Sequence, residues 1–396
     1  MEQQSLKQIW NKIKPKGDYM MWFIIVVLSL WGLLAIYSST GALAYKNKGG
    51  IVEIYLLQQM ALLAAGFLVM FFIHSIHYRY FLSISKILLW LSYPLLIYTL
   101  IFGIEINGAR RWVNILGITF QASDFAKLAI VMFVIRELAR KQESIDDFKK
   151  TFLPILGHIT AICILIAPEN LSTALVLFTT CMVILFIGRV KIAHLALIGG
   201  GVTLAGTLLF LILFFTPESA LKNTGRMLTW KKRIENFGKT EVDADKSYQN
   251  DHAKIAIATG GVFGKLPGNS TERNYLPEAY SDFIYAIVAE EYGLLGALFM
   301  LLLYLLFLYR SMRIVFKSPK AFGALLAVGI SFSLVMQALI NMAVAVNLFP
   351  VTGLTLPLVS KGGTSVILTS IAFGVIMSVS RYVEQDEPEE LKPQLV

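Results

Sequence analysis

The sequence predicts an all-α polytopic membrane protein with about ten transmembrane helices and a large extracytoplasmic loop between helices 7 and 8. Of the 396 residues, 56% are hydrophobic and only 15% are charged. The mean hydropathy is +0.65, and apolar runs of about 20 residues, the length that crosses a bilayer, recur along the chain. A soluble protein of this length would carry more charge. We expect residues 1–396 to form one membrane domain.

The apolar runs define ten expected spans. The first follows a basic segment, and its apolar core is too long for a signal peptide, so we expect it to be retained. The spans lie near residues 20–38, 55–75, 82–103, 120–137, 152–168, 171–188, 192–216, 283–309, 322–348 and 364–380.

The positions of the basic residues predict the orientation of these spans. With the N-terminus inside, the cytoplasmic segments carry 19 of the 35 Lys and Arg residues, whereas the short outer loops carry five. Cytoplasmic loops are enriched in Lys and Arg, so both termini are predicted to be cytoplasmic. The same topology accounts for the net charge of +9 without a nucleic-acid partner. The loop at 217–282 is then outside, and it is too long for a simple connector.

Two adjacent arginines, Arg110 and Arg111, stand in "NGARRW" on the outer side, against the general charge bias. An arginine guanidinium matches the geometry of phosphate oxygens, so Arg111 is a candidate for binding a phosphate-bearing substrate. Contact with lipid headgroups is the simpler alternative.

Asp124 and Lys127 are charged residues inside the fourth span. Their spacing of three places them on one helix face, where they can form a pair. Paired charges within a span are tolerated when they face a polar cavity, so both are candidates for substrate binding. A purely structural ion pair explains them equally well. Gln337 and Asn341, four apart in the ninth span, are candidates for the same cavity, although amides also join helices together.

The stretch "LPGNSTERNYLPEAYSDFIYAIVAEEYGLLGA" ends the long loop with Glu278 and Asp282, just where the eighth span begins. A carboxylate at a partly dry boundary can act as a general base on a hydroxyl, because desolvation raises its pKa. The alternative is an acid favoured by the helix dipole. That alternative explains Asp282 but not Glu290 and Glu291, which lie deeper in the span.

The segment "PVTGLTLPLVSKGGTS" precedes the tenth span and contributes Ser360, Gly362 and Gly363 as candidates for substrate binding. The two glycines allow main-chain N–H groups to approach a ligand, and the N-terminus of the following helix favours anions.

Together these stretches resemble the SEDS family (shape, elongation, division and sporulation proteins of the FtsW/RodA type). "NGARRW", "FQASDFAK", "LPEAYSDFIYAIVAEE" and "LTLPLVSKGGTS" are similar to four family motifs in the same order, and the resemblance covers nearly the whole chain. Two of the stretches, "FPVTGLTLPLVS" and "LPGNS", look closer to FtsW than to RodA.

The resemblance implies an inverting peptidoglycan glycosyltransferase that polymerises lipid II, the undecaprenyl-pyrophosphate-linked disaccharide-pentapeptide, on the outer face of the cytoplasmic membrane. It places the family's essential loop aspartate at Asp282 as the catalytic base. It places the family's motif arginine at Arg111 and its intramembrane acid and lysine at Asp124 and Lys127. The sequence departs from the family pattern at Ala122, Asn170 and Lys361, so no specific role is carried over to Asn170 or Lys361.

The resemblance also implies partners and a location. We expect a class B penicillin-binding protein as transpeptidase partner, other division proteins, and a place in the bacterial inner membrane at the division septum. No metal cluster is visible in the motifs, although a divalent cation such as Mg²⁺ or Mn²⁺ could assist the pyrophosphate. The alternatives are a flippase for lipid-linked precursors, an elongation role of the RodA type, and a non-catalytic scaffold. A flippase would be expected to show internal repeats, which the sequence does not show.

Overall fold

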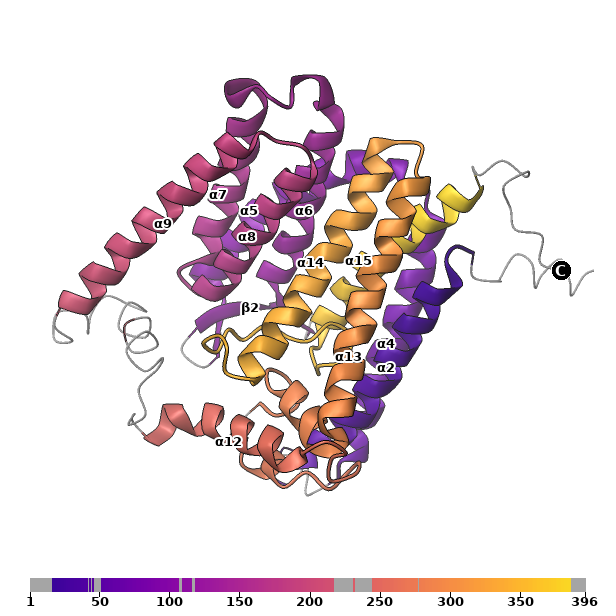
Figure 1. Ribbon diagram of the computed structural model, residues 1–396, viewed down its shortest axis with the longest axis vertical. Helices are drawn as coiled ribbons and strands as arrows, with labels where there is room; N and C mark the ends of the chain where they lie inside the picture. Colours follow the sequence, from indigo (N-terminus) through magenta and orange to yellow (C-terminus); the bar gives the residue numbers. More distant parts are fainter. Residues whose placement is uncertain are drawn as a thin grey trace, which may run out of the picture.

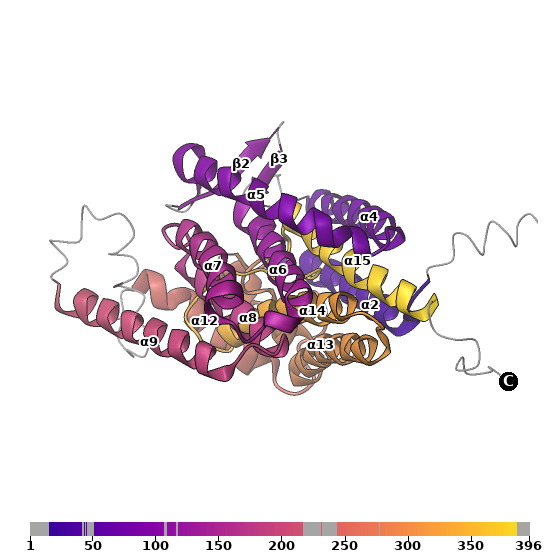
Figure 2. The ribbon, with the colours of Figure 1, turned by 90° about the horizontal axis from the view of Figure 1, so that it is seen from above.

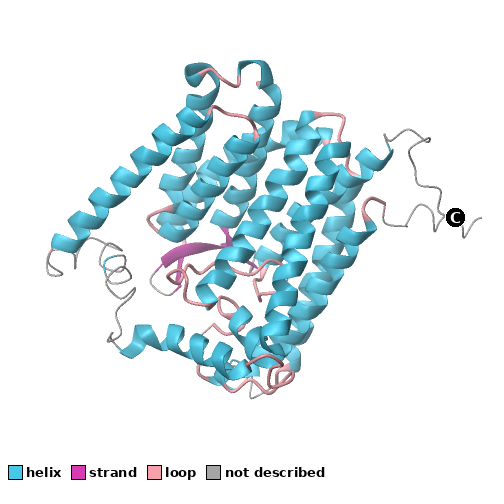
Figure 3. Cartoon of the chain, in the orientation of Figure 1, coloured by secondary structure: helices cyan, strands magenta, loops and turns pink. Residues whose placement is uncertain are grey.

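The computed structural model contains mainly helices that run roughly alongside one another (Figure 1, Figure 3). The predicted helical membrane fold is therefore confirmed. The structure describes residues 16–41, 43, 45, 51–106, 109–115, 118–216, 231, 244–276 and 278–385.

A helix lies on each of the ten segments predicted to span the membrane. The helices are α2 (Tyr19–Ser39), α4 (Glu53–Ser75), α5 (Arg79–Phe102), α6 (Ala122–Arg140), α7 (Leu153–Ile166), α8 (Leu171–Ile187), α9 (Ile192–Phe215), α13 (Ile284–Lys317), α14 (Ala321–Ala345) and α15 (Thr364–Gln385). A short π-helix, η2 (Phe148–Phe152), leads directly into α7, and a 3-10 turn, η1 (Gln142–Ser144), follows α6.

Eight of the helices in the described part of the chain are long and apolar enough to cross a membrane. The other two fall short for separate reasons: α6 carries five charged residues, and α8 has only 17 residues. The number of ten spans therefore stays a prediction.

A small antiparallel sheet joins α5 to α6, a feature that the sequence analysis did not predict. Its strands are β1 (Ile104–Ile106), β2 (Ala109–Ile115) and β3 (Ile118–Gln121), in the order β1-β2-β3. Trp112 pairs with Gln121, and Val113 pairs with Phe120. Figure 2 shows β2 and β3 beside α5 at the margin of the bundle. The sheet fixes the arginine pair in an extended strand instead of a flexible loop.

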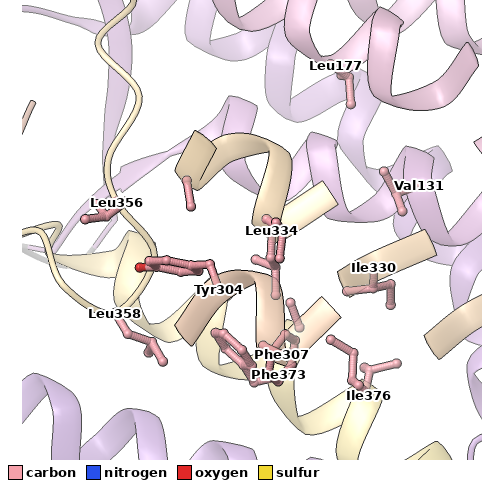
Figure 4. Close-up of a cluster of buried hydrophobic side chains, with 14 of the residues drawn as sticks. Val131, Leu177, Tyr304, Phe307, Ile330, Leu334, Leu356, Leu358, Phe373 and Ile376 are labelled. Atoms are coloured by element: carbon pink, nitrogen blue, oxygen red, sulfur yellow. The ribbon is translucent and has the colours of Figure 1, made fainter. Parts of the chain in front are cut away.

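Small residues allow neighbouring helices to approach closely. At Gly66 of α4 an added Cβ would lie only 2.5 Å from the hydroxyl oxygen of Ser370 in α15. Such contacts are typical of helices that associate in lipid, where the hydrophobic effect cannot drive packing. Large apolar side chains fill the centre of the bundle, as Figure 4 shows for Tyr304 and Phe307 of α13 with Phe373 of α15. Many apolar side chains on the outer surface are exposed, which suits contact with lipid.

The start of α2 lies beside the end of α15. The main-chain N–H of Asp18 donates to Ser380 Oγ at 2.8 Å, and the Asp18 carboxylate accepts hydrogen bonds from Met20 N and Arg310. Both ends of the described chain are thus at the same end of the bundle. The arrangement agrees with two termini on one side, although residues 1–15 and 386–396 lie outside the described residues.

The described part of the 217–282 loop includes helix α12 (Ala244–Gly260) and the 3-10 turn η3 (Glu272–Asn274), which pack against α2 and α13 at the end of the bundle away from the α6–α7 junction (Figure 1). Helix α13 is kinked at Gly293, whose φ of 67° and ψ of −168° are not helical. Most of residues 217–243 lie outside the described residues.

Candidate functional site

Asp282 lies in the turn that leads into α13, two residues before the helix begins at Ile284. The side-chain amide of Asn341 in α14 donates to the main-chain oxygen of Asp282 at 3.0 Å, and also to the main-chain oxygen of Leu354 at 2.6 Å. Asn341 is buried. One amide therefore fixes the Asp282 turn against the loop between α14 and α15.

Arg111 lies in β2, and its Nε donates to the main-chain oxygen of Glu169 at 2.9 Å. A Cβ atom added at Gly353 would lie 3.6 Å from Arg111 Nη1 and 3.6 Å from Asp282 Oδ2. The guanidinium and the carboxylate therefore both lie next to the same glycine of the α14–α15 loop. The structure brings the predicted base and the predicted phosphate-binding arginine together from distant parts of the sequence.

Ser360 serves to hold the loop in place. Its hydroxyl donates to the main-chain oxygen of Ser281 at 2.7 Å and accepts from the main-chain N–H of Leu356 at 2.8 Å. The side chain is buried. The substrate-binding role predicted for Ser360 stays a prediction, and the contacts show a hydroxyl that positions the residue preceding Asp282.

Lys361 sits between two tyrosines that the sequence analysis did not single out. Its Nζ lies 3.8 Å from the ring centre of Tyr55 in α4 and 5.2 Å from that of Tyr280. Burial lowers the pKa of Lys361 to about 8, although the Glu278 carboxylate opposes the shift. Burial and the neighbouring Glu278 raise the pKa of Tyr280. No spacing in the sequence links Tyr55 to this loop, because it reaches the site from another helix.

Glu278 belongs to this group of side chains beside Asp282. Its φ is 58°, a left-handed conformation that non-glycine residues rarely adopt. Such strained positions are found at ligand-binding sites more often than elsewhere. Its negative charge favours higher pKa values for Lys361 and Tyr280. Glu278 lies four residues before Asp282 in the sequence.

Asp124 and Lys127 form the predicted pair, with Lys127 Nζ 2.7 Å from Asp124 Oδ1. Their side chains are only 13% and 16% exposed, respectively. Lys127 Nζ also donates to Gln337 Oε1 at 3.3 Å, and Gln337 Nε2 donates to the main-chain oxygen of Thr355 at 2.8 Å. The pair lines a cavity between α6, α14 and α15. Gln337 thus connects the intramembrane charges to the loop that carries Gly353.

Gly362 and Gly363 precede the N-terminus of α15. Gly363 has a φ of +50°, and no atom lies within 4 Å of the position where its Cβ would be. The adjacent Thr364 hydroxyl donates to the main-chain oxygen of Thr119 in β3 at 2.9 Å. An open, glycine-lined helix start beside the sheet is compatible with the predicted anion contact, which stays a prediction.

Glu290 and Glu291 have a structural role that the sequence analysis did not identify. Glu290 is fully buried; it pairs with Lys265 Nζ at 2.6 Å and accepts from the main-chain N–H of Thr271 at 3.0 Å. Glu291 accepts from the hydroxyl of Ser38 in α2. The two carboxylates fasten the end of the long loop to α13 and α2.

Within the described residues, no three His, Cys, Asp or Glu side chains are grouped in a way that could hold a metal ion. Mg²⁺ usually binds through one or two carboxylates together with substrate phosphates. Asp282 could supply such a carboxylate.

Comparison with known proteins identifies relatives over nearly the whole chain. The family model of FtsW, RodA and SpoVE, which is described as a cell cycle protein, matches residues 18–385. Stage V sporulation protein E of Bacillus subtilis is 33% identical over 375 residues, covering 93% of this chain and 98% of the relative. The probable peptidoglycan glycosyltransferase FtsW of Nitrosomonas europaea is 34% identical, covering 93% of each chain. Its Bacillus subtilis counterpart is 31% identical, covering 97% of this chain and 96% of the relative.

Two solved structures share the fold. A chain from a peptidoglycan synthase complex, described as coordinating polymerization and crosslinking, is 25% identical with a TM-score of 0.74, and the match covers 93% of this chain and 99% of that chain. The rod shape determining protein RodA of Thermus thermophilus is 24% identical with a TM-score of 0.65, and the match covers 93% of this chain and 98% of that chain. The second likeness shows the fold alone.

Proposed function

The chain belongs to the FtsW/RodA/SpoVE family of cell cycle proteins and is a peptidoglycan glycosyltransferase, and from this we propose that it polymerises lipid II with Asp282 as the general base. The observation that carries the residue assignment is that Arg111 and Asp282 both lie 3.6 Å from the Cβ position of Gly353. The reaction requires a base that accepts a proton and a positive charge that stabilises the departing pyrophosphate, both at one site.

In this reaction the hydroxyl of one sugar attacks the anomeric carbon of another, whose pyrophosphate leaves. The attacking hydroxyl must lose a proton, and the Asp282 carboxylate accepts it. Negative charge develops on the departing pyrophosphate, and the Arg111 guanidinium stabilises it through charge-assisted hydrogen bonds. Direct displacement inverts the configuration at the anomeric carbon.

The surrounding residues hold these two groups in position. Asn341 and Ser360 fix the main chain at Asp282 and Ser281, while the Glu169 main-chain oxygen orients Arg111. Preorganised groups of this kind stabilise a transition state without rearranging during the reaction. We assign the Asp124–Lys127 pair, Glu278, Gly362 and Gly363 to substrate contact, with Lys127 as a second candidate partner of the pyrophosphate. Mg²⁺ or Mn²⁺ is retained as a candidate cofactor.

We further propose a bacterial inner-membrane location, with both termini in the cytoplasm and the Asp282 site on the outer face. The count of Lys and Arg in the loops supports this orientation. A class B penicillin-binding protein is the proposed transpeptidase partner, because a similar chain belongs to a complex that coordinates polymerization with crosslinking. A division role at the septum is proposed from the relatives named FtsW.

Purified protein with labelled lipid II, alone and with the transpeptidase, tests this function. We expect glycan strands that lengthen with time. Transfer of lipid II across vesicles without polymer would favour a flippase, and neither activity would favour a scaffold. Septal localisation of a fluorescent fusion would support the division role, and an even distribution along the cell wall would favour elongation.

A further inference from the structure

A second polar cavity lies between α5, α6 and α7. These three helices pack against one another (Figure 1, Figure 2). Its volume is about 440 Å³, and its lining includes Lys86, Arg136, Arg140, Lys141 and Glu137. It lies toward the C-terminal end of α6. Asp124 is 12 residues earlier than Arg136 in the same helix, so the cavity is roughly 18 Å from the Asp124–Lys127 pair along the helix axis.

The charges of this cavity are not balanced. Four basic side chains face one carboxylate, that of Glu137. Glu137 is shared between Arg136 and Lys141, with Lys141 Nζ at 3.3 Å from its Oε2. Arg136 is only 8% exposed. Its Nε is buried and has no hydrogen-bond partner among the described residues. A buried donor of this kind requires an acceptor, since an unsatisfied polar group is costly.

The surroundings of the cavity are apolar and open to the outside of the bundle. Trp90 forms part of the lining and is 58% exposed, and Leu91 and Leu153 beside the lining residues are also exposed. Side chains of this type on a membrane helix face acyl chains, and tryptophan is enriched at the level of the headgroups. The occupant should therefore carry both an anionic group and an apolar portion.

We propose that this cavity binds the phosphate of an anionic phospholipid, such as phosphatidylglycerol. Arg136 and Arg140 contact the phosphate, Lys86 and Lys141 add positive charge, and the acyl chains lie along Trp90. Basic cavities between transmembrane helices suit such headgroups. With the proposed orientation, the lipid belongs to the cytoplasmic leaflet, whereas the binding itself does not depend on the glycosyltransferase assignment.

Native mass spectrometry of the full-length protein, titrated with phosphatidylglycerol or phosphatidylethanolamine, tests this proposal without turnover. The double variant Lys86→Gln with Arg140→Gln changes two exposed lining residues, which should leave folding intact. We expect it to bind phosphatidylglycerol roughly 30-fold more weakly than wild type, with phosphatidylethanolamine binding unchanged. The matched control, Lys191→Gln with Lys320→Gln, removes the same charge from exposed positions outside the cavity and should bind as wild type.

A second measurement needs no charge variant. Phosphatidylglycerol with brominated acyl chains should quench part of the tryptophan fluorescence of the wild-type protein. In the Trp90→Phe variant, this quenching should be lost. Equal phosphatidylglycerol affinity in the lining variant, the control and wild type would overturn the proposal. Displacement of the lipid by inorganic phosphate at similar concentration would also overturn it, because the cavity would then recognise a soluble anion.

Discussion

Asn341 holds the main chain of Asp282: its amide donates a hydrogen bond of 3.0 Å to the Asp282 carbonyl oxygen. The same amide donates to the main-chain oxygen of Leu354, one residue after Gly353, the glycine next to which Arg111 and Asp282 both lie. This buried side chain in α14 therefore helps to set the position of the proposed base relative to the arginine.

Asn341→Leu keeps a similar size but removes both hydrogen bonds and leaves two carbonyl oxygens without this donor. We expect a loss of stability of about 1–3 kcal/mol, together with reduced glycosyltransferase activity, because the Asp282 turn is no longer fixed. Thermal unfolding and lipid II polymerisation measure the two effects. Ser331→Ala is the control. Ser331 lies in α14, as Asn341 does, and its buried hydrogen bond to Ser311 of α13 is away from Asp282, so its loss should cost stability but not kcat. Equal kcat losses in both variants would remove the positioning role.

Asp124→Ala and Lys127→Ala should each impair stability or activity, because either change leaves an unpaired charge in a span. Breaking such a buried pair typically costs about 3–5 kcal/mol. The pair Asp251–Lys254 has the same spacing of three but is about half exposed, so Asp251→Ala should have little effect. Expression, thermal stability and polymerisation of the variants check this. Full activity and stability in both single variants at 124 and 127 would contradict a functional cavity.

Gly353→Ala tests the contact point of Arg111 and Asp282. The φ of Gly353 is +71°, which strains any residue with a Cβ, and the new methyl group would touch both charged side chains at about 3.6 Å. We expect a stability loss of about 1 kcal/mol and a clear loss of polymerisation. Gly261→Ala introduces similar strain at a φ of +57° with no atom within 4 Å, so it should keep activity. Similar activity in both alanine variants would argue against a reaction at this glycine.

Lys361 should react with an amine-directed reagent at unusually low pH. Only the neutral amine reacts, and the pKa of about 8 makes half of it neutral near pH 8, whereas a free lysine titrates near 10.4. Labelling followed by mass spectrometry should show a midpoint near pH 8. Glu278→Gln removes a negative charge that raises this pKa, so the midpoint should move to lower pH. A midpoint near 10 in the wild type would contradict the half-buried position between Tyr55 and Tyr280.

The helices were predictable because each apolar run is about as long as a bilayer is thick, and the structure places a helix on every such run. The sheet at 104–121 could not be predicted, because strands of three to seven residues leave no distinctive pattern beside long apolar runs. Asp124 and Lys127 were recognisable as a pair from local helical spacing. The proximity of Arg111 to Asp282 depends on tertiary packing, and so does the role of Glu290 in holding the long loop. Local spacing in the sequence reveals neither of them.

Polymerisation of lipid II by purified Asp282→Asn tests the central claim most directly. Asn keeps the size and much of the hydrogen bonding of Asp but cannot accept a proton at neutral pH. Because Asn341 holds only the main chain at this position, the variant should fold, insert and bind its partner normally. We expect the rate of glycan synthesis to fall roughly 10²–10⁴-fold, the typical effect of losing a general base. Glu278→Gln, one turn earlier, should have a milder effect. Glycan synthesis by Asp282→Asn at close to the wild-type rate would contradict the assignment of Asp282 as the base.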